Sequence, residues 1–348
     1  MELKQYLSPD DINTWHRMVG QATNIVVLGH AGPDGDAMGA ILALTHWLHK
    51  QGKQAVAMTP NPCPDFLSWL PGFSDVVFAK MARYKAQRLL NEADLLILLD
   101  FNAISRLEDL APSVEACCAP RIMIDHHLNP EPCAELIVSD SAAAATCEVL
   151  FCMMHQLGAY DDIDTDIAEC LYCGLMTDTG AFAYNSNRPE LFHIISMLLD
   201  KGIDKDQIYR NVFYSYTEGR LRLMGYLLYE KMQYYAEEHT AVFSLTKEEM
   251  KRFSYVRGDA EGFVNLPLQI KGTRLSISLR EDTEKALIRV SLRSIGSFRC
   301  DQMAEQFFNG GGHQNAAGGT LPKPMSEALK VVDQAIAASR EQLINIES

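Results

Sequence analysis

The stretch Arg121-Ile122-Met123-Ile124-Asp125-His126-His127 is a short apolar run followed directly by a carboxylate and two imidazoles. Two more apolar runs have the same form, because residues 25–28 lead into Gly29-His30-Ala31-Gly32-Pro33-Asp34-Gly35-Asp36, and residues 95–99 lead into Asp100. Short apolar runs bounded by turn residues are typical of buried parallel strands. Ligands of open α/β sheets bind outside the carboxyl ends of the strands, so these polar side chains are expected to meet in one crevice.

Strand-like runs alternate with helical patterns from about residue 24 to about residue 203. Strands separated by helices indicate βαβ units and a mainly parallel sheet. Ser8-Pro9-Asp10-Asp11 has the form of an N-cap followed by proline at the first helical position, which predicts an opening helix. The expected strands are 24–28, 54–58, 94–99, 121–124 and 135–138, and the expected helices are 37–49, 143–156, 165–176 and 189–201.

The pattern changes after residue 203. Residues 204–232 have a helical pattern without a Gly/Ser-rich stretch, which predicts a structured connector. Beyond it, strand-like runs, a hairpin signal at Glu281-Asp282-Thr283-Glu284 and two helical patterns predict a second, smaller α/β domain. The predicted division is therefore 1–203, 204–232 and 233–348. The strands expected after residue 230 are 231–236, 240–245, 275–280 and 286–292, and the helices are 300–308 and 326–343.

The bulk composition restricts the class of protein. A chain of 348 residues with 47% hydrophobic content can bury a substantial core. Its net charge of −14 argues against a broad basic surface for long duplex nucleic acid, although metal ions and backbone amides can reverse the potential inside one cleft. Without a membrane-length apolar run or a signal-peptide pattern in Met1-Glu2-Leu3-Lys4-Gln5, a cytoplasmic protein with no membrane partner is expected. The nine scattered cysteines do not indicate a disulfide framework.

The polar side chains after the strands form a set that fits divalent cations. Converging carboxylates would repel one another and lose hydration unless cations lay among them. Carboxylates mixed with imidazoles favour manganese, with magnesium, cobalt or iron as substitutes. Two ions about 3.5–4 Å apart would generate hydroxide and stabilise both the attacking and the leaving oxygen of a phosphoryl group. The candidate ligands are His30, Asp34, Asp36, Asp100, His126 and Asp178.

Each of these residues taken alone has a simpler explanation. An aspartate after a strand is most often a turn residue or a helix cap, and a lone buried histidine is most often hydrogen-bonded within the core. The occurrence of such residues in four separate segments, each at the end of a strand or helix, favours the metal site.

The second strong signal is the glycine-rich segment Asn309-Gly310-Gly311-Gly312-His313-Gln314-Asn315-Ala316-Ala317-Gly318-Gly319. Successive glycines can turn backbone N–H groups towards one point and form an anion-binding nest, especially where a helix begins. A flexible loop is the alternative, but it would not require a histidine and small residues immediately afterwards. We therefore expect this segment to bind phosphate.

These motifs together resemble a known family. His30-x3-Asp34-x-Asp36, Asp100, Asp125-His126-His127 and Asp178 resemble the four-motif signature of the DHH phosphoesterase superfamily, and segment 309–319 resembles the GGGH-x-x-A-A-G motif of the DHHA1 domain. The resemblance implies one manganese on His30, Asp34 and Asp100. The resemblance also implies a second manganese on Asp36, Asp100, His126 and Asp178.

The same resemblance implies further roles. His127 would lie close to the reacting phosphate, as a catalytic residue with Asp100, and Asp125 would fix the orientation of an imidazole. The run Val290-Ser291-Leu292-Arg293-Ser294 matches a family strand whose arginine and serine contact substrate, although Arg293 could also be a solvated charge at a strand end. Arg257 and Arg280 are weaker candidates. The implied substrate-binding residues are Arg293, Ser294, Gly310, Gly311, Gly312 and His313.

A DHH domain followed by DHHA1 is most similar to the bacterial nanoRNase and pAp-phosphatase group. This similarity implies an active site in the cleft between the two domains. It also implies manganese-dependent hydrolysis of short oligoribonucleotides, dinucleotides or 3′-phosphoadenosine 5′-phosphate by metal-activated hydroxide. Still open are a cyclic-dinucleotide phosphodiesterase, an inorganic pyrophosphatase or polyphosphatase, and a non-catalytic nucleotide sensor, although no ligand position is lost. A homodimer is expected only from base rates.

Overall fold

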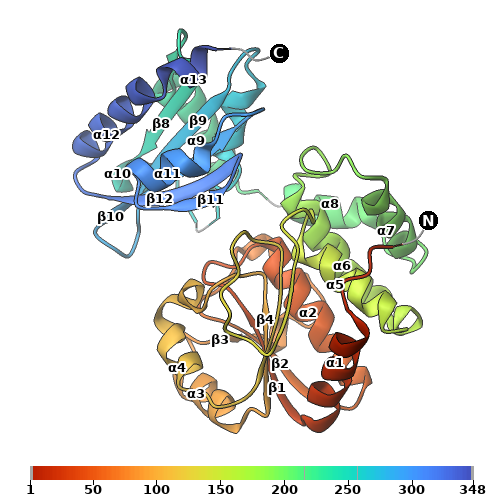
Figure 1. Ribbon diagram of the computed structural model, residues 1–348. Coiled ribbons are helices and arrows are strands. Elements are labelled where there is room, and N and C mark those ends of the chain that lie inside the picture. The colour runs from red at the N-terminus through yellow and green to blue at the C-terminus, as the bar shows by residue number, and fades with distance from the viewer. Residues whose placement is uncertain (1–2, 215, 257, 346–348) are drawn as a thin grey trace. The chain divides into compact units, whose positions relative to one another are not determined.

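The computed structural model describes residues 3–214, 216–256 and 258–345 (Figure 1). The chain divides into two compact units, Met1–Ser215 and Tyr216–Ser348. The first unit has a parallel six-stranded sheet and the second has a separate six-stranded sheet, so the predicted α/β fold with two unequal domains is confirmed. The finer division at residues 203 and 232 stays a prediction.

The sheet of the first unit is wholly parallel, with the strand order β3-β2-β1-β4-β5-β6. The chain reverses its direction of travel across the sheet between β1 and β4, and this switch point is where open α/β sheets bind ligands. All five strands expected here are present, whereas β3 is only two residues long and carries no period that a sequence could reveal. The strands are β1 (Asn24–Gly29), β2 (Gln54–Thr59), β3 (Val77–Phe78), β4 (Leu95–Leu99), β5 (Arg121–Asp125) and β6 (Leu136–Ser139).

Helices cover both faces of this sheet, with α3 and α4 on one face and α1 and α2 on the other (Figure 1). The expected N-terminal helix begins as predicted, because Ser8 forms a capping box with Asp11. The helix expected from residue 143 begins three residues later, because Ala145 has an extended backbone. The helices are α1 (Pro9–Gln21), α2 (Gly35–Lys50), α3 (Arg83–Glu92), α4 (Ala111–Glu115), α5 (Thr146–Gln156), α6 (Thr165–Asp178), α7 (Pro189–Leu199) and α8 (Lys205–Phe213), with 3-10 turns η1 (Asp65–Leu67), η2 (Phe73–Asp75), η3 (Ile104–Leu110) and η4 (Tyr160–Asp162).

Two glycines let α2, α5 and α6 approach one another closely. A Cβ atom at Gly39 would lie 2.4 Å from the carbonyl oxygen of Cys170, and one at Gly174 would lie 2.3 Å from Cys147 Sγ and 2.8 Å from Asp36 Oδ1. Real Cβ atoms do not tolerate such distances, so a larger residue at either position would force the helices apart. The glycines therefore bring the start of α2 and the end of α6, which both carry candidate ligands, close together.

The second unit is built on a mixed sheet with the order β11-β12-β10-β9-β8-β7, in which only the β8–β9 pair is parallel. The predicted hairpin at residues 281–284 joins β9 to β10, and the glycine-rich segment 309–319 forms the edge strand β11 and the first residues of β12. None of the described helices is long and apolar enough to cross a membrane. The elements are α9 (Glu218–Tyr226), η5 (Leu227–Lys231), β7 (Gln233–Tyr235), β8 (Thr240–Leu245), α10 (Lys247–Arg252), η6 (Phe263–Gln269), β9 (Leu275–Glu281), β10 (Leu287–Ser294), α11 (Cys300–Phe307), β11 (Gly311–His313), β12 (Ala316–Pro322), α12 (Met325–Ala338) and α13 (Arg340–Ile344).

The β9–β10 hairpin gives a pH-dependent stability prediction. Partial burial raises the pKa of Asp282, but hydrogen bonds from the Glu284 and Lys285 amides and from Arg289 Nε outweigh this and hold it at about 2. A pKa below the unfolded value of 3.8 stabilises the fold above that pH, and the stabilisation is lost as the pH falls towards 2. We expect Asp282→Asn to lower the free energy of unfolding by about 1–2 kcal/mol at pH 7, and by much less at pH 2.5.

Urea unfolding at several pH values measures this difference. Glu248→Gln is the matched control, because Glu248 is an exposed carboxylate in the same unit. A loss for Asp282→Asn that stayed constant from pH 7 to pH 2.5 would contradict the prediction.

Candidate metal centre

The candidate ligands lie at the carboxyl edge of the first unit's sheet. His30 follows β1 directly, Asp100 follows β4, and His126 follows β5, as the sequence predicts. Asp34 is the N-cap of α2, and its Oδ1 accepts hydrogen bonds from the amides of Asp36 and Ala37 at 3.1 Å. The capping explanation for Asp34 is therefore correct for one oxygen, while its other oxygen remains available.

The first group of donors consists of His30, Asp34 and Asp100, whose candidate ligand atoms all lie within 4.8 Å of one another. His30 Nε2 is 3.4 Å from Asp100 Oδ2 and 3.9 Å from Asp34 Oδ2. The other ring nitrogen, Nδ1, lies 3.0 Å from the carbonyl oxygen of Ala31. That contact makes Nδ1 the donor nitrogen and leaves Nε2 facing the two carboxylates.

The second group consists of Asp36, His126 and Asp178, again with ligand atoms within 4.8 Å. His126 Nε2 is 3.4 Å from Asp178 Oδ2 and 3.8 Å from Asp36 Oδ2. The same nitrogen is 3.5 Å from Asp100 Oδ1. Asp100 therefore presents Oδ2 to the first group and Oδ1 to the second, so its carboxylate lies where one residue can serve two ions.

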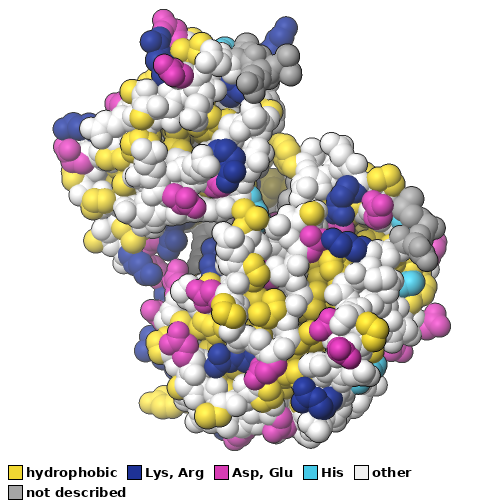
Figure 2. Space-filling model, in the orientation of Figure 1, with side chains coloured by type: hydrophobic (Ala, Val, Ile, Leu, Met, Phe, Trp, Pro, Cys, Tyr) yellow, Lys and Arg dark blue, Asp and Glu magenta, His cyan; other side chains and the backbone are white. Residues whose placement is uncertain are grey.

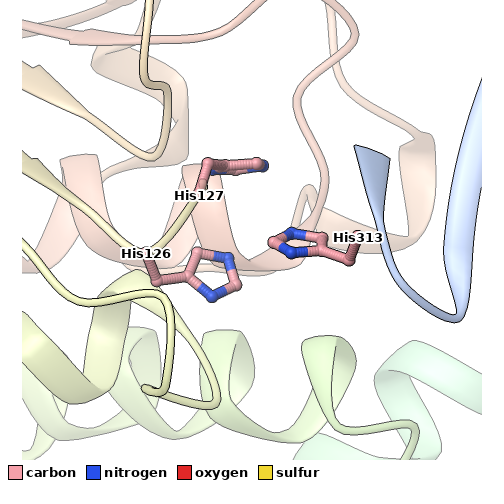
Figure 3. Close-up of side chains that lie close together, drawn as sticks. All are labelled: His126, His127 and His313. Atoms are coloured by element: carbon pink, nitrogen blue, oxygen red, sulfur yellow. The ribbon is translucent and has the colours of Figure 1, made fainter. Parts of the chain in front are cut away.

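His127 and Asp125 form a separate pair beside Asp100. His127 Nδ1 lies 2.7 Å from Asp125 Oδ1 and 3.8 Å from Asp100 Oδ1. The Asp125 carboxylate is fully buried, and the hydrogen bond fixes the orientation of the His127 ring. The rings of His126 and His127 are 4.9 Å apart at an interplanar angle of 67° (Figure 3).

The charges of this site are unbalanced without cations. Burial raises the pKa of Asp36 well above its usual range, with further contributions from Asp100 and Asp178. Loss of hydration raises the pKa of Asp178 to about 7, although 30% of its side chain is exposed at the edge of the site. Burial lowers the pKa of His30 and His126, but the surrounding carboxylates outweigh it and raise both to about 9.

Asp100 is the exception among the buried carboxylates. Burial raises its pKa, but the hydrogen bond from His30 and the three nearby imidazoles outweigh this and hold it below its usual range. Oxygen and imidazole donors whose ligand atoms lie within 4.8 Å of one another fit divalent ions.

Sequence reasoning missed one residue of this site, Thr146. Its amide donates to Asp36 Oδ2 at 2.6 Å and its hydroxyl donates to Asp100 Oδ1 at 2.8 Å, and the residue is fully buried. Thr146 thereby holds one carboxylate from each side of the site. The sequence offers one indication of this role, a threonine directly after the alanine run 142–145. The helix predicted from residue 143 places Thr146 inside a helix, so the prediction does not include it among the site residues.

The non-helical residues before α5 also place a backbone acceptor. The carbonyl oxygen of Ala143 lies 3.4 Å from His126 Nδ1, so Nε2 points to the carboxylates. This segment is fixed by Glu148, whose Oε2 accepts from the Ala144 amide at 2.7 Å and from Arg188 at 2.6 Å. A continuous helix from residue 143 could not make these contacts.

The candidate substrate residues all belong to the second unit. Arg293 lies near the end of β10, opposite Ser276 and Ala316, and its Nη1 donates to the carbonyl oxygen of Leu292. The buried Ser294 hydroxyl donates to the carbonyl oxygen of Phe298 and accepts from Asn315 Nδ2, both at 2.9 Å. Arg280 lies over the ring of Tyr255, and Arg257 lies outside the described residues.

The glycine-rich segment has a packing role as well. A Cβ atom at Gly310 would lie 1.8 Å from the carbonyl oxygen of Gly318, and one at Gly312 would lie 2.5 Å from that of Ala316. Both glycines are therefore required by the close pairing of this segment with β12. At Gly311 the nearest atoms to a Cβ would be 3.9 Å away, in the side chain of Glu305. Packing therefore does not require a glycine at position 311.

Comparison with known proteins identifies the family of each of the two units. Residues 24–175 match the DHH family, N-terminal domain, and residues 241–338 match the DHHA1 domain. The crystal structure of an exopolyphosphatase-related protein from Bacteroides fragilis is 45% identical, with a TM-score of 0.93 over 99% of this chain and 100% of that one.

Several of the curated relatives that cover most of this chain are named for an activity. The bifunctional oligoribonuclease and PAP phosphatase NrnA of Thermus thermophilus is 28% identical over 92% of this chain and 90% of its own length. Its counterpart in Bacillus subtilis is 24% identical over 88% of this chain and 91% of its own length. The chain therefore belongs to the DHH phosphoesterase superfamily, with a DHHA1 second domain, and is a metal-dependent hydrolase of phosphoester bonds.

Proposed function

We propose that this protein hydrolyses short oligoribonucleotides and dinucleotides, and also 3′-phosphoadenosine 5′-phosphate, with two manganese ions. The observation that carries the proposal is the position of Asp100, whose two oxygens face the His30 group and the His126 group respectively. In this assignment His30, Asp34 and Asp100 hold one ion, and Asp36, Asp100, His126 and Asp178 hold the other. Magnesium, cobalt or iron would be substitutes.

The roles of the protein's own groups follow from their contacts. When bound, the ions would lower the pKa of water and neutralise charge on the phosphoryl oxygens. Thr146 holds Asp36 and Asp100 in position through its amide and hydroxyl. Asp125 accepts from His127 Nδ1 and fixes the orientation of the ring, and we assign to His127 the holding or delivery of a proton at the leaving oxygen.

The choice of substrate rests on the relatives and on the second unit. The relatives from Thermus thermophilus and Bacillus subtilis are named for oligoribonuclease and PAP phosphatase activity. We assign the contact with a substrate phosphate to Arg293, to the glycine segment and to His313. Ser294 would hold the loop after β10 in place and not contact the substrate, because its hydroxyl is already hydrogen-bonded to Phe298 and Asn315 inside the second unit.

A second candidate is hydrolysis of inorganic polyphosphate, because the relative that is 45% identical is named exopolyphosphatase-related. A substrate panel separates the candidates: a diribonucleotide, a pentaribonucleotide, 3′-phosphoadenosine 5′-phosphate, a cyclic dinucleotide, pyrophosphate and polyphosphate, each with excess manganese. We expect the highest kcat/KM for the ribonucleotides or the adenosine bisphosphate. Faster release of phosphate from polyphosphate than of mononucleotide from every nucleotide substrate would overturn the proposal.

The glycine segment allows a matched pair of substitutions. Because a Cβ atom at position 312 would meet the backbone of β12, Gly312→Ala should destabilise the second unit by more than about 1 kcal/mol. Gly311→Ala meets no close atom, so it should leave the melting temperature unchanged and raise the KM for a dinucleotide about tenfold by blocking close approach of the phosphate. Melting curves and steady-state kinetics test both; an unchanged KM in Gly311→Ala would remove this segment from the proposed substrate site.

A further inference from the structure

Residues 80–88, Lys-Met-Ala-Arg-Tyr-Lys-Ala-Gln-Arg, carry four cations and no acidic residue in a chain whose net charge is −14. They include two large exposed hydrophobic side chains, Tyr84 at 95% exposure and Met81 at 74%. Figure 2 shows basic side chains and a protruding hydrophobic one at the lower left, in the region where Figure 1 draws α3 and α4. We call residues 80–88 the basic-aromatic segment. The metal site does not use it.

Two of these charges, those of Arg83 and Lys85, do not stabilise the helix that carries them, whereas Arg88 lies 3.9 Å from Glu92 one turn further along α3. α3 begins at Arg83, with no acidic residue in its first turn and no side-chain cap from Ala82. Cations near a helix N-terminus are unfavourable, because the helix dipole is positive there. Among the described residues, Arg83 and Lys85 form no ion pair that would compensate for this. A surface selected only for stability would have acidic residues at these positions.

The segment lies on the same edge of the sheet as the candidate metal centre. β2 separates β1 from β3, and residues 79–82 follow the carboxyl end of β3. The amide of Lys80 donates to the carbonyl oxygen of Pro60, and the next residue, Asn61, accepts from the amide of Gly32 in the His30 loop. Two strand spacings are about 10 Å, so a single strand of a few nucleotides that begins at the metal centre can reach this segment.

We propose that the basic-aromatic segment binds the part of a single-stranded oligoribonucleotide that extends beyond the nucleotide at the metal centre. Arg83 and Lys85 bind phosphates, and Tyr84 stacks on a base. Cations beside an exposed aromatic ring are the combination that holds single strands without sequence preference. The inference rests on the proposed function and deepens it, because it predicts that oligonucleotides gain binding energy which a dinucleotide cannot.

The test compares the full-length wild type with Arg83→Glu, Lys85→Glu and Tyr84→Ala. An acidic residue near the start of a helix is favourable, so the two charge variants should fold at least as stably as the wild type. We expect the ratio of kcat/KM for a pentaribonucleotide to that for a dinucleotide to fall about tenfold in each charge variant. In Tyr84→Ala it should fall between about fivefold and about a hundredfold. The logarithmic salt dependence for the pentanucleotide should weaken by about 0.7 per removed cation.

Arg17→Glu is the matched control, because Arg17 is exposed on α1, which leads into the opposite, amino end of β1. It makes the same change in net charge and should leave the substrate ratio unaltered. An unaltered ratio in all three segment variants, or an equal fall in Arg17→Glu, overturns the inference. If the wild type cleaves no phosphoester, the proposed function fails instead. Fluorescence anisotropy of a labelled pentaribonucleotide then decides the inference, and equal Kd values for wild type and variants overturn it.

Discussion

Asp100→Asn should lower kcat/KM for a dinucleotide by at least about a thousandfold. Asp100 is the residue that both donor groups share, so the loss of its charge weakens both candidate ion positions at once. The backbone tolerates this change, because Asp100 has a φ of 65° and asparagine is among the few residues that adopt this conformation readily. The amide oxygen of asparagine can still accept the hydrogen bond from Thr146. The variant therefore removes charge and leaves the shape of the site intact.

Steady-state kinetics with saturating manganese measure this effect, and circular dichroism checks the fold. Asp94→Asn is the matched control at the amino end of the same strand, where Asp94 Oδ2 accepts from the amides of Thr23 and Asn24. It is expected to keep activity within about twofold. Retention of more than a tenth of wild-type activity by Asp100→Asn would show that the two ions do not share this residue.

Removal of divalent ions should abolish hydrolysis and lower the melting temperature of the first unit. The buried carboxylates of the site include Asp36, whose raised pKa reflects uncompensated charge and lost hydration. An ion that binds only the folded state, present at about 100 times its Kd, adds about 2.7 kcal/mol. For a unit of this size each ion should therefore raise the melting temperature by about 5–10 °C.

Differential scanning calorimetry and isothermal titration with manganese measure the shift and the stoichiometry, which should be two. Asp178→Asn should reduce the stoichiometry to about one, because Asp178 belongs to the second donor group alone. Asp94→Asn should behave as the wild type does. The absence of any thermal shift with manganese, magnesium, cobalt or iron at millimolar concentration would contradict the two-ion assignment.

The sequence predicted the parallel sheet because its central strands are continuous apolar runs that end abruptly in polar residues. β4 and β5 are buried along nearly their whole length, so no polar residue interrupts the signal. The strand β12 (Ala316–Pro322) escaped prediction. So did the two-residue strand β3 and the edge strand Gly311–His313. Neither has a hydrophobic period, and glycines at an edge are explained only by the atoms of the neighbouring strand.

The start of α5 shows a different limit of prediction from sequence. Residues 143–145 are alanines, the strongest helix formers, and the sequence accordingly predicts helix from residue 143. The structure keeps these residues out of the helix, because Glu148, which Arg188 contacts, accepts from the Ala144 amide and because the carbonyl oxygen of Ala143 lies beside His126 Nδ1. Tertiary contacts with a residue more than forty positions away outweigh a propensity of a few tenths of a kcal/mol.

The sequence by itself determined which residues are candidate ligands and on which edge of the sheet they lie, because strand ends and turn chemistry are local properties. Only the tertiary structure decided how these residues are grouped. The sharing of Asp100 and the double contact of Thr146 depend on distances between segments that are far apart in the chain. Those distances are fixed by the close packing of α2, α5 and α6, which Gly39 and Gly174 permit.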